Sequence, residues 1–105
     1  MWQPHTYSRT KTLFQEFAQS FQDADEVIVT EVYAAREPKE EFSSAEIVRA
    51  MPNLSARYIE TLPEVSDYLL QHLKPGDVVL VLSAGDADQI STDVVKGLQE
   101  KVTDV

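Results

Sequence analysis

The chain has 105 residues, 43% of them hydrophobic, which fits one domain with a buried core and excludes wholesale disorder and fibrous repeats. Its 18 acidic and 9 basic residues give a net charge of −9, so nucleic acid is not an expected partner. Cysteine is absent, which excludes disulfides, and the longest apolar run, residues 78–82, is too short to span a membrane, so we expect a soluble protein without a membrane partner.

Five apolar residues recur at three- to four-residue spacing between positions 10 and 21 and predict an amphipathic helix: Leu13, Phe14, Phe17, Ala18 and Phe21. Ser8 or Thr10 can cap its start. The next apolar residues, at 27–29 and 32–33, are mostly β-branched. They predict a central parallel strand that is buried on both faces.

The middle of the chain continues this alternation. Residues 34–42 contain Pro38 and several charged side chains, which is typical of an exposed loop. Ser43 and Glu46 have the spacing of a capping box, so we expect a short helix that runs to about Met51. Residues 56–59 then predict a short, weaker strand.

The last third contains two predicted helices and a strand. Thr61 and Glu64 repeat the capping-box spacing at the start of a third helix, which residues 74–77 end. Residues 78–82 are entirely apolar and predict a second strand that is buried on both faces. After a loop at 83–88, one apolar stripe predicts the final helix: Ile90, Val94, Val95, Leu98 and Val102.

The alternation of helices and strands predicts an α/β fold, with a mostly parallel sheet and helices on both faces. No linker or repeat divides the chain, so we expect residues 1–105 to form a single domain. Ligands of such sheets bind beyond the carboxyl ends of the strands, where loops converge. Four segments qualify, and the strand order decides which of them meet: residues 3–10, 33–38, 60–61 and 83–86.

The segment QPHTYSRT at residues 3–10 carries the most chemistry of the four. It places an imidazole, hydroxyls, a phenol and a guanidinium at the start of a helix. Arg9 can grip a carboxylate through two hydrogen bonds, and free amides at a helix start point the same way. The segment therefore predicts an anion-binding site. In the alternative, Ser8 and Thr10 only cap the helix, while His5 and Arg9 face water.

The other polar candidates carry weaker signals. Asp86 can accept a hydrogen bond from a hydroxyl or from metal-bound water, but Gly85 after a strand often serves only to turn the chain. Arg36 and Glu37 are typical of a solvated loop. The chain has no phosphate-binding loop, dinucleotide fingerprint or metal-spaced histidine pair. We therefore expect no catalytic and no metal-ligating residues in it.

Three motifs, in this order, resemble a known family: QPHTYSRT at residues 3–10, YAARE at 33–37 and SAGD at 83–86. They resemble the carboxy-terminal domain of the Mur ligases, over nearly the whole chain. The resemblance implies a three-layer Rossmann-like domain, the third domain of a longer enzyme, with a truncated first strand. It also implies a cytoplasmic protein, because these ligases act in the synthesis of cell-wall peptidoglycan.

The resemblance further implies an ATP- and Mg²⁺-dependent ligase that joins L-alanine to UDP-N-acetylmuramate. ATP would phosphorylate the sugar-linked carboxylate, and the amine of alanine would attack the acyl phosphate. The amino-terminal and central domains would be the partners of this domain, and the central domain would carry the phosphate-binding loop. The isolated domain is then expected to be inactive, to bind no cofactor tightly and to self-associate weakly through a strand edge.

By the same resemblance, His5, Thr6 and Arg9 are substrate-binding residues that help to hold the carboxylates of the amino acid and the muramoyl substrate. Thr6 stands where many relatives have a second arginine. Tyr33, Glu37 and Asp86 match segments near the interdomain cleft, on the nucleotide side. The alternative reading is a free-standing binding or regulatory module that resembles a flavodoxin-like or response-receiver domain.

Overall fold

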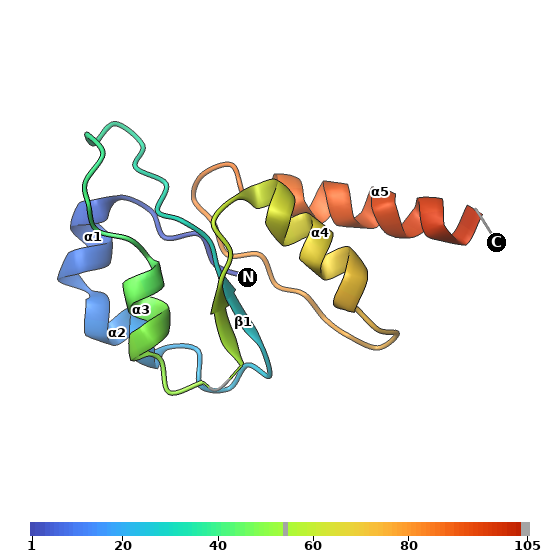
Figure 1. The fold of residues 1–105 in the computed structure, drawn as a ribbon, viewed down its shortest axis with the longest axis horizontal. Helices are drawn as coiled ribbons and strands as arrows, with labels where there is room; N and C mark the ends of the chain where they lie inside the picture. The colour runs from blue at the N-terminus through green and yellow to red at the C-terminus, as the bar shows by residue number, and fades with distance from the viewer. Residues whose placement is uncertain (54, 104–105) are drawn as a thin grey trace.

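The computed structural model describes residues 1–53 and 55–103. Its helices and strands, in chain order, are α1 (Tyr7–Thr12), α2 (Phe14–Gln19), β1 (Val27–Val29), α3 (Ala45–Ala50), β2 (Ala56–Tyr58), α4 (Leu62–His72) and α5 (Gln89–Thr103). Figure 1 shows α1, α2 and α3 gathered on one side of the strands and α4 and α5 on the other. The predicted α/β fold is therefore confirmed.

The sheet is parallel, and the amino terminus lies inside it. Strands β1 and β2 pair in parallel. Trp2 forms parallel bridges with Val29 on one side and with Leu82 on the other. The parallel order is therefore β2, β1, the amino-terminal segment and the segment that ends at Leu82. The predicted strand from 27 to 33 is shorter than expected, because after Val29 only Tyr33 forms a further bridge, to His5.

Strand β1 is buried on both faces because each face contacts a different hydrophobic cluster. Its outer residues, Val27 and Val29, belong to a cluster with Trp2, Ala18, Ile47 and Met51. Its middle residue, Ile28, belongs to a second cluster with Val65, Leu69, Ala87, Ile90 and Val94. Full burial of an aliphatic side chain contributes roughly 1.5–3 kcal/mol, so β1 is central to the stability of the domain.

The predicted helix over residues 10–21 begins earlier and is divided in two. Helix α1 begins at Tyr7, because the Thr6 hydroxyl accepts a hydrogen bond from the Arg9 amide at 3.3 Å. The prediction that Ser8 or Thr10 caps this helix was wrong. Leu13, with a φ of −105°, separates α1 from α2.

The start of α3 is held by Glu31, and the predicted capping box of Ser43 and Glu46 was wrong. The Glu31 carboxylate accepts hydrogen bonds from the Ser44 amide at 3.1 Å and from the Ser43 hydroxyl at 2.7 Å. It also accepts one from the hydroxyl of Tyr58, at the end of β2. The Ser43 hydroxyl accepts from the Ala45 amide at 3.2 Å, but the reciprocal bond from Glu46 that a capping box requires is replaced by the Glu31 carboxylate, which follows β1.

The prediction that residues 78–82 form a buried strand was wrong on both counts, because among them only Leu82 forms a bridge, to Trp2, and most of the run is exposed. Val78, Leu80 and Leu82 expose 85%, 69% and 47% of their surface. An apolar run predicts burial on both faces because helices usually cover both sides of a parallel sheet. This segment lies at the edge of the sheet, beyond the amino-terminal segment, and the exposure of the three side chains shows that no described helix covers their face. Among the described residues, no helix is long and apolar enough to cross a lipid bilayer.

The environment of Glu31 makes stability depend on pH. Burial alone would raise the pKa of Glu31, but hydrogen bonds from Tyr58, Val32, Ser43 and Ser44 outweigh it and lower the pKa below its ordinary value of 4.5. Burial and the Glu31 carboxylate in turn raise the pKa of Tyr58 to about 12. A carboxyl group whose pKa is lowered by folding stabilises the fold above its unfolded pKa, and this contribution is lost as the pH falls through the folded pKa.

We predict that Glu31→Gln lowers the free energy of unfolding at neutral pH, and that its difference from the unchanged chain shrinks as the pH falls below 4.5. Urea denaturation at a series of pH values measures this difference. Glu26→Gln is the matched control, because Glu26 is exposed and makes only a 3.9 Å ion pair with Arg57. A Glu31→Gln difference that stays constant down to low pH would contradict this role.

Candidate functional site

Three of the four predicted strand-end segments meet at the carboxyl edge of the sheet. The Thr6 amide donates to the Tyr33 carbonyl at 2.8 Å, and the Tyr33 amide donates to the Pro4 carbonyl at 2.8 Å. A Cβ atom at Gly85 would lie 2.9 Å from both the Tyr33 ring and the Gln3 side-chain oxygen, so only glycine fits there without a shift. The segments that meet are residues 3–10, 33–38 and 83–86.

The fourth segment, residues 60–61, serves the fold. The Glu60 carbonyl accepts hydrogen bonds from the Thr30 hydroxyl at 2.7 Å and from the Glu31 amide at 3.3 Å. Thr61 caps α4, as predicted, because its hydroxyl accepts from the Glu64 amide at 3.4 Å. The Glu60 carbonyl and the Thr61 hydroxyl are therefore engaged within the domain.

Gln3, which no sequence pattern singled out, connects the first segment to the third. Its side chain is buried, its Nε2 donates to Asp86 Oδ1 at 2.9 Å, and its Oε1 accepts from the Ser83 hydroxyl at 2.8 Å. The Ser83 hydroxyl also accepts from the Gly85 amide at 2.9 Å. Asp86 is thus held in place by Gln3. A glutamine beside Trp2 in a buried strand was the signal that could have identified it.

His5 lies beside Tyr33 with an unpaired ring nitrogen. The two rings stack with their centroids 5.7 Å apart and an interplanar angle of 18°. Within the described ranges, the buried Nδ1 atom of His5 has no hydrogen-bond partner. Buried polar atoms are nearly always paired, so an orphaned imidazole nitrogen at a strand end marks a position where a ligand or water can bind.

The start of α1 is already occupied by a carboxylate of the chain itself. Glu37 Oε1 accepts hydrogen bonds from the amides of Tyr7 at 2.5 Å and Ser8 at 3.3 Å. The hydrogen bond from the Ser8 side chain is the largest cause that lowers the pKa of Glu37 below 4.5. Burial acts in the opposite direction, and the two amides and the charge of Lys11 add to the lowering. Glu37 lies in a largely exposed loop, as predicted, but its carboxylate binds the start of α1. The prediction that the amides of this helix start are free for an external anion was wrong.

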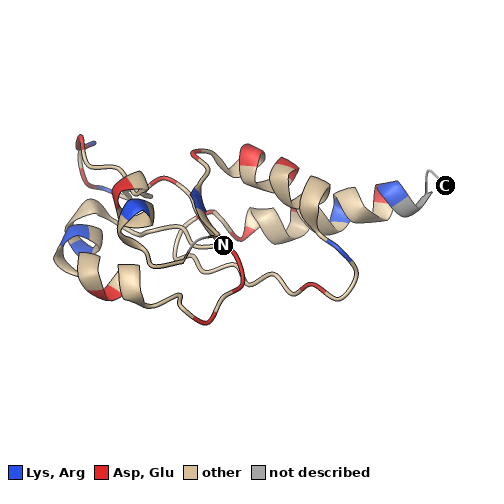
Figure 2. Ribbon diagram, turned by 60° about the horizontal axis from the view of Figure 1, so that its bottom comes forward, with Lys and Arg blue, Asp and Glu red and all other residues tan. Residues whose placement is uncertain are grey.

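Arg9 is one of two free cations in the segments that meet, because Arg36, in the loop after Tyr33, is also exposed and makes no ion pair among the described residues. The Arg9 side chain is exposed, and in the part of the chain that the structure describes its guanidinium makes no ion pair, whereas Lys11 binds Glu40 at 2.6 Å. Figure 2 shows the basic positions of α1 in blue at one end of the molecule. The backbone before Arg9 is constrained, because Thr6 has a φ of 65°, which a β-branched residue adopts only at an energetic cost.

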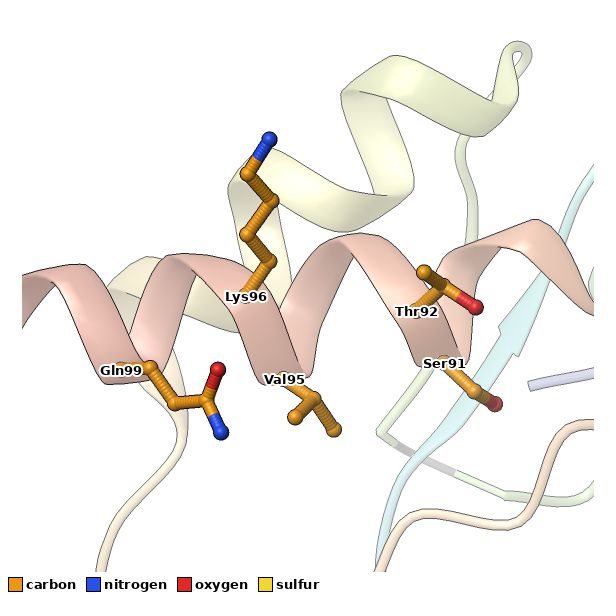
Figure 3. Close-up of a pocket in the computed structure, with 5 residues that line it drawn as sticks. All are labelled: Ser91, Thr92, Val95, Lys96 and Gln99. Carbon is orange, nitrogen blue, oxygen red and sulfur yellow. The ribbon is translucent and has the colours of Figure 1, made fainter.

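A hollow of about 460 Å³ lies away from this cluster, on α5. Figure 3 shows the residues that line it, all from successive turns of this one helix: Ser91, Thr92, Val95, Lys96 and Gln99. Because no second element forms an opposing wall, the hollow cannot enclose a small molecule as a binding cleft does. The strand-end cluster is therefore the stronger candidate.

The described residues contain no group of three or more His, Asp or Glu side chains placed to hold a metal ion. What the cluster offers is a guanidinium, an imidazole with an unpaired nitrogen and an aromatic ring. These groups suit recognition of a carboxylate or another anion.

The fold places the chain in the class of parallel α/β domains. Domains of this class bind ligands where the ends of the strands converge. A family comparison then identifies the chain more closely. The model of the family described as Mur ligase, glutamate ligase domain, matches residues 3–85. The chain therefore belongs to the Mur ligase family, as the three motifs predicted.

Several curated relatives are ligases of one kind. The UDP-N-acetylmuramate--L-alanine ligase of Desulforamulus reducens is 43% identical over 105 residues, which is 96% of this chain and 23% of that protein. The ligases of the same name from Desulfitobacterium hafniense and Nostoc punctiforme are 46% and 44% identical, over 90% and 95% of this chain and 22% and 21% of their own length. The chain thus spans less than a quarter of these relatives. The similarity does not favour the free-standing flavodoxin-like or receiver-like module.

We predict that Glu37→Ala frees the start of α1. Hydrogen exchange of the Tyr7 and Ser8 amides should become faster, because both lose their carboxylate acceptor. Heteronuclear NMR measures the exchange rate of each amide. Glu41→Ala is the control, since Glu41 is an exposed residue of the same loop, and it should leave both rates unchanged. If the Tyr7 and Ser8 amides exchange at the same rates in Glu37→Ala and Glu41→Ala, Glu37 does not cap this helix.

Proposed function

We propose that this chain is the carboxy-terminal, substrate-binding part of an ATP-dependent ligase that joins L-alanine to UDP-N-acetylmuramate. The observation that carries the proposal is the similarity of 90–96% of the chain, at 43–46% identity, to ligases of that name. The strand-end cluster supports it, because both reacting molecules carry a carboxylate and Arg9 is an exposed cation without an ion pair among the described residues. In this role the chain closes the site over its substrates and is inactive alone.

The remaining parts of the enzyme would come from outside these 105 residues. The proposal assigns the phosphate-binding loop, ATP and Mg²⁺ to a central domain, and the UDP-sugar to an amino-terminal domain. It is supported by the match of the chain to less than a quarter of its relatives and by the lack of a phosphate-loop motif in residues 1–105. The proposal includes a cytoplasmic location and a complete three-layer, Rossmann-like arrangement in the whole enzyme.

Within the site, we assign the substrate carboxylates to side chains and not to helix amides. Glu37 fills the amides at the start of α1, so an incoming carboxylate would meet the exposed Arg9 guanidinium. The unpaired Nδ1 of His5 offers a second polar contact. Thr6 is a positioning residue, because its hydroxyl caps the turn that carries Arg9.

Tyr33, Glu37 and Asp86 would shape the wall of the cleft that faces the nucleotide. Tyr33 contacts His5 through its ring, and Asp86 is held by Gln3. Glu37 fixes the loop that follows Tyr33 by binding α1. These roles are those of positioning groups, since none of the three needs to react with a substrate.

The proposal predicts that this chain restores activity when it replaces the matching segment of the Desulforamulus reducens ligase. The chimera should form product from UDP-N-acetylmuramate and L-alanine in an ATP-dependent manner, well above the same ligase with that segment deleted. Detection of the amide product by mass spectrometry tests this. A folded, soluble chimera with no more activity than the deletion would contradict the proposal.

In the same chimera, Arg9→Ala should raise the Michaelis constant for L-alanine or for the sugar nucleotide roughly ten- to hundredfold. A charge-assisted hydrogen bond is worth about 1.5–3 kcal/mol, and each 1.4 kcal/mol is about tenfold. Steady-state kinetics with each substrate varied in turn measures the effect. Arg49→Ala, at an exposed cation on α3, is the matched control and should leave both constants unchanged. If the Michaelis constants for both substrates are unchanged in Arg9→Ala, the Arg9 side chain faces solvent and does not bind a substrate.

A further inference from the structure

Gly85 lies directly against the side chain of Tyr33. A Cβ atom added at Gly85 would lie 2.9 Å from Cγ and Cδ1 of the Tyr33 ring and 2.9 Å from Oε1 of Gln3, closer than Cβ atoms approach other heavy atoms in proteins. The φ of Gly85 is not positive, since among the described glycines only Gly76 has a positive φ. The contact with Tyr33 and Gln3, and not the backbone conformation, therefore requires glycine at this position.

Gln3 holds the loop that carries Gly85 in place. The buried Gln3 side chain donates to Asp86 Oδ1 at 2.9 Å and accepts from the Ser83 hydroxyl at 2.8 Å. The same hydroxyl accepts from the Gly85 amide at 2.9 Å. The loop is thus anchored to Gln3 on both sides of Gly85. A retreat of Gly85 would leave a buried side-chain amide without its hydrogen bonds, which is costly.

The Tyr33 ring in turn contacts the ring of His5. The backbones of the two residues are joined by a parallel bridge, and their rings stack with centroids 5.7 Å apart. Tyr33 is 37% exposed, so its ring can swing outward without disturbing the core. A side chain at position 85 would therefore displace the Tyr33 ring from the stack with His5, while the backbones of both residues stay paired.

We propose that Gly85 and Gln3 are positioning residues of the strand-end cluster. Gln3 fixes the loop, Gly85 leaves room for the Tyr33 ring, and this ring holds the His5 imidazole in the orientation that binds a substrate. The orientation of His5 is thus set by a loop from the other end of the chain. The inference rests on the proposed function in one respect, namely that His5 binds a substrate.

Gly85→Ala tests the contact in the 105-residue chain, and Gly97→Ala is its matched control. Both substitutions add one methyl group to a tight contact, but a Cβ atom at Gly97 would meet the side chain of Leu70, at 2.7 Å, where α5 packs against α4. The NMR resonances of the His5 ring protons report its stacking, because a neighbouring aromatic ring shifts them. Gly85→Ala should change these resonances and leave those of His72, on α4, unchanged. Gly97→Ala should leave the His5 resonances unchanged.

Kinetics of the chimera with the Desulforamulus reducens ligase test the consequence for binding. Gly85→Ala should raise the Michaelis constant for the substrate that Arg9 binds by about tenfold, because a small misplacement of a binding group weakens binding strongly. Gly97→Ala should leave this constant unchanged, even if it lowers the melting temperature. Tyr33→Ala should raise the constant, and adding Gly85→Ala to it should cause no further increase, because both substitutions act through the same ring.

A reversed hydrogen bond tests the role of Gln3. Gln3→Glu places two carboxylates at the 2.9 Å contact with Asp86, so it should raise the same Michaelis constant. Adding Asp86→Asn restores a donor and an acceptor at this contact, and the Ser83 hydroxyl can still donate to the substituted side chain. The double variant should therefore regain the original constant. If Gly85→Ala does not fold, Gln3→Glu with and without Asp86→Asn replaces it in both measurements.

The two measurements separate this inference from the proposed function. If the chimera without further substitutions is inactive, the proposed function fails, and the NMR comparison decides whether Gly85 positions His5. His5 resonances that are the same in Gly85→Ala and in the unchanged chain would overturn the inference. An active chimera in which Gly85→Ala raises the Michaelis constant no more than Gly97→Ala does would overturn it as well.

Discussion

The structure depends on the pairing of one short segment, the first five residues, with neighbours on both sides. Trp2 bridges Val29 on one side and Leu82 on the other, so it joins the strand pair β1–β2 to the carboxy-terminal half of the chain. The Trp2 side chain also packs against Phe17 and Phe21, with centroids 4.7 and 5.2 Å away. Because the strands are parallel, this pairing brings their carboxyl ends to one edge, where the residues proposed to bind substrate follow.

Two carboxylates on the stretch after β1 then hold the site in shape. Glu31 satisfies the amide at the start of α3, and Glu37 satisfies two amides at the start of α1. Helix starts have unpaired amides and a partial positive charge, so a carboxylate is favoured at each. The backbone between the two glutamates, which includes Tyr33, is thereby fixed at both ends. The consequence for binding is that an external carboxylate must be recognised by side chains, chiefly Arg9, and not by these helix starts.

Much of the fold could be predicted because its signals are local. Apolar spacing of three to four residues identified α4 and α5, and the Thr61 cap of α4 formed as predicted. The site segments were identified singly, but their meeting could not be predicted, since it depends on Trp2 lying between β1 and Leu82. Gln3 was missed for the same reason: its hydrogen bonds reach Ser83 and Asp86, 80 and 83 residues away along the chain.

By itself the sequence determined the element types, the α/β class and the Mur ligase family, because periodicity and short motifs are properties of neighbouring residues. Only the tertiary structure decided which carboxylate caps which helix and which apolar face is left open. Ser43 and Glu46 had the spacing of a capping box, but the Ser44 amide and the Ser43 hydroxyl donate to Glu31, which follows β1. The run at 78–82 had the composition of a buried strand, yet burial depends on what packs above it, and that is set by the position of the segment at the edge of the sheet.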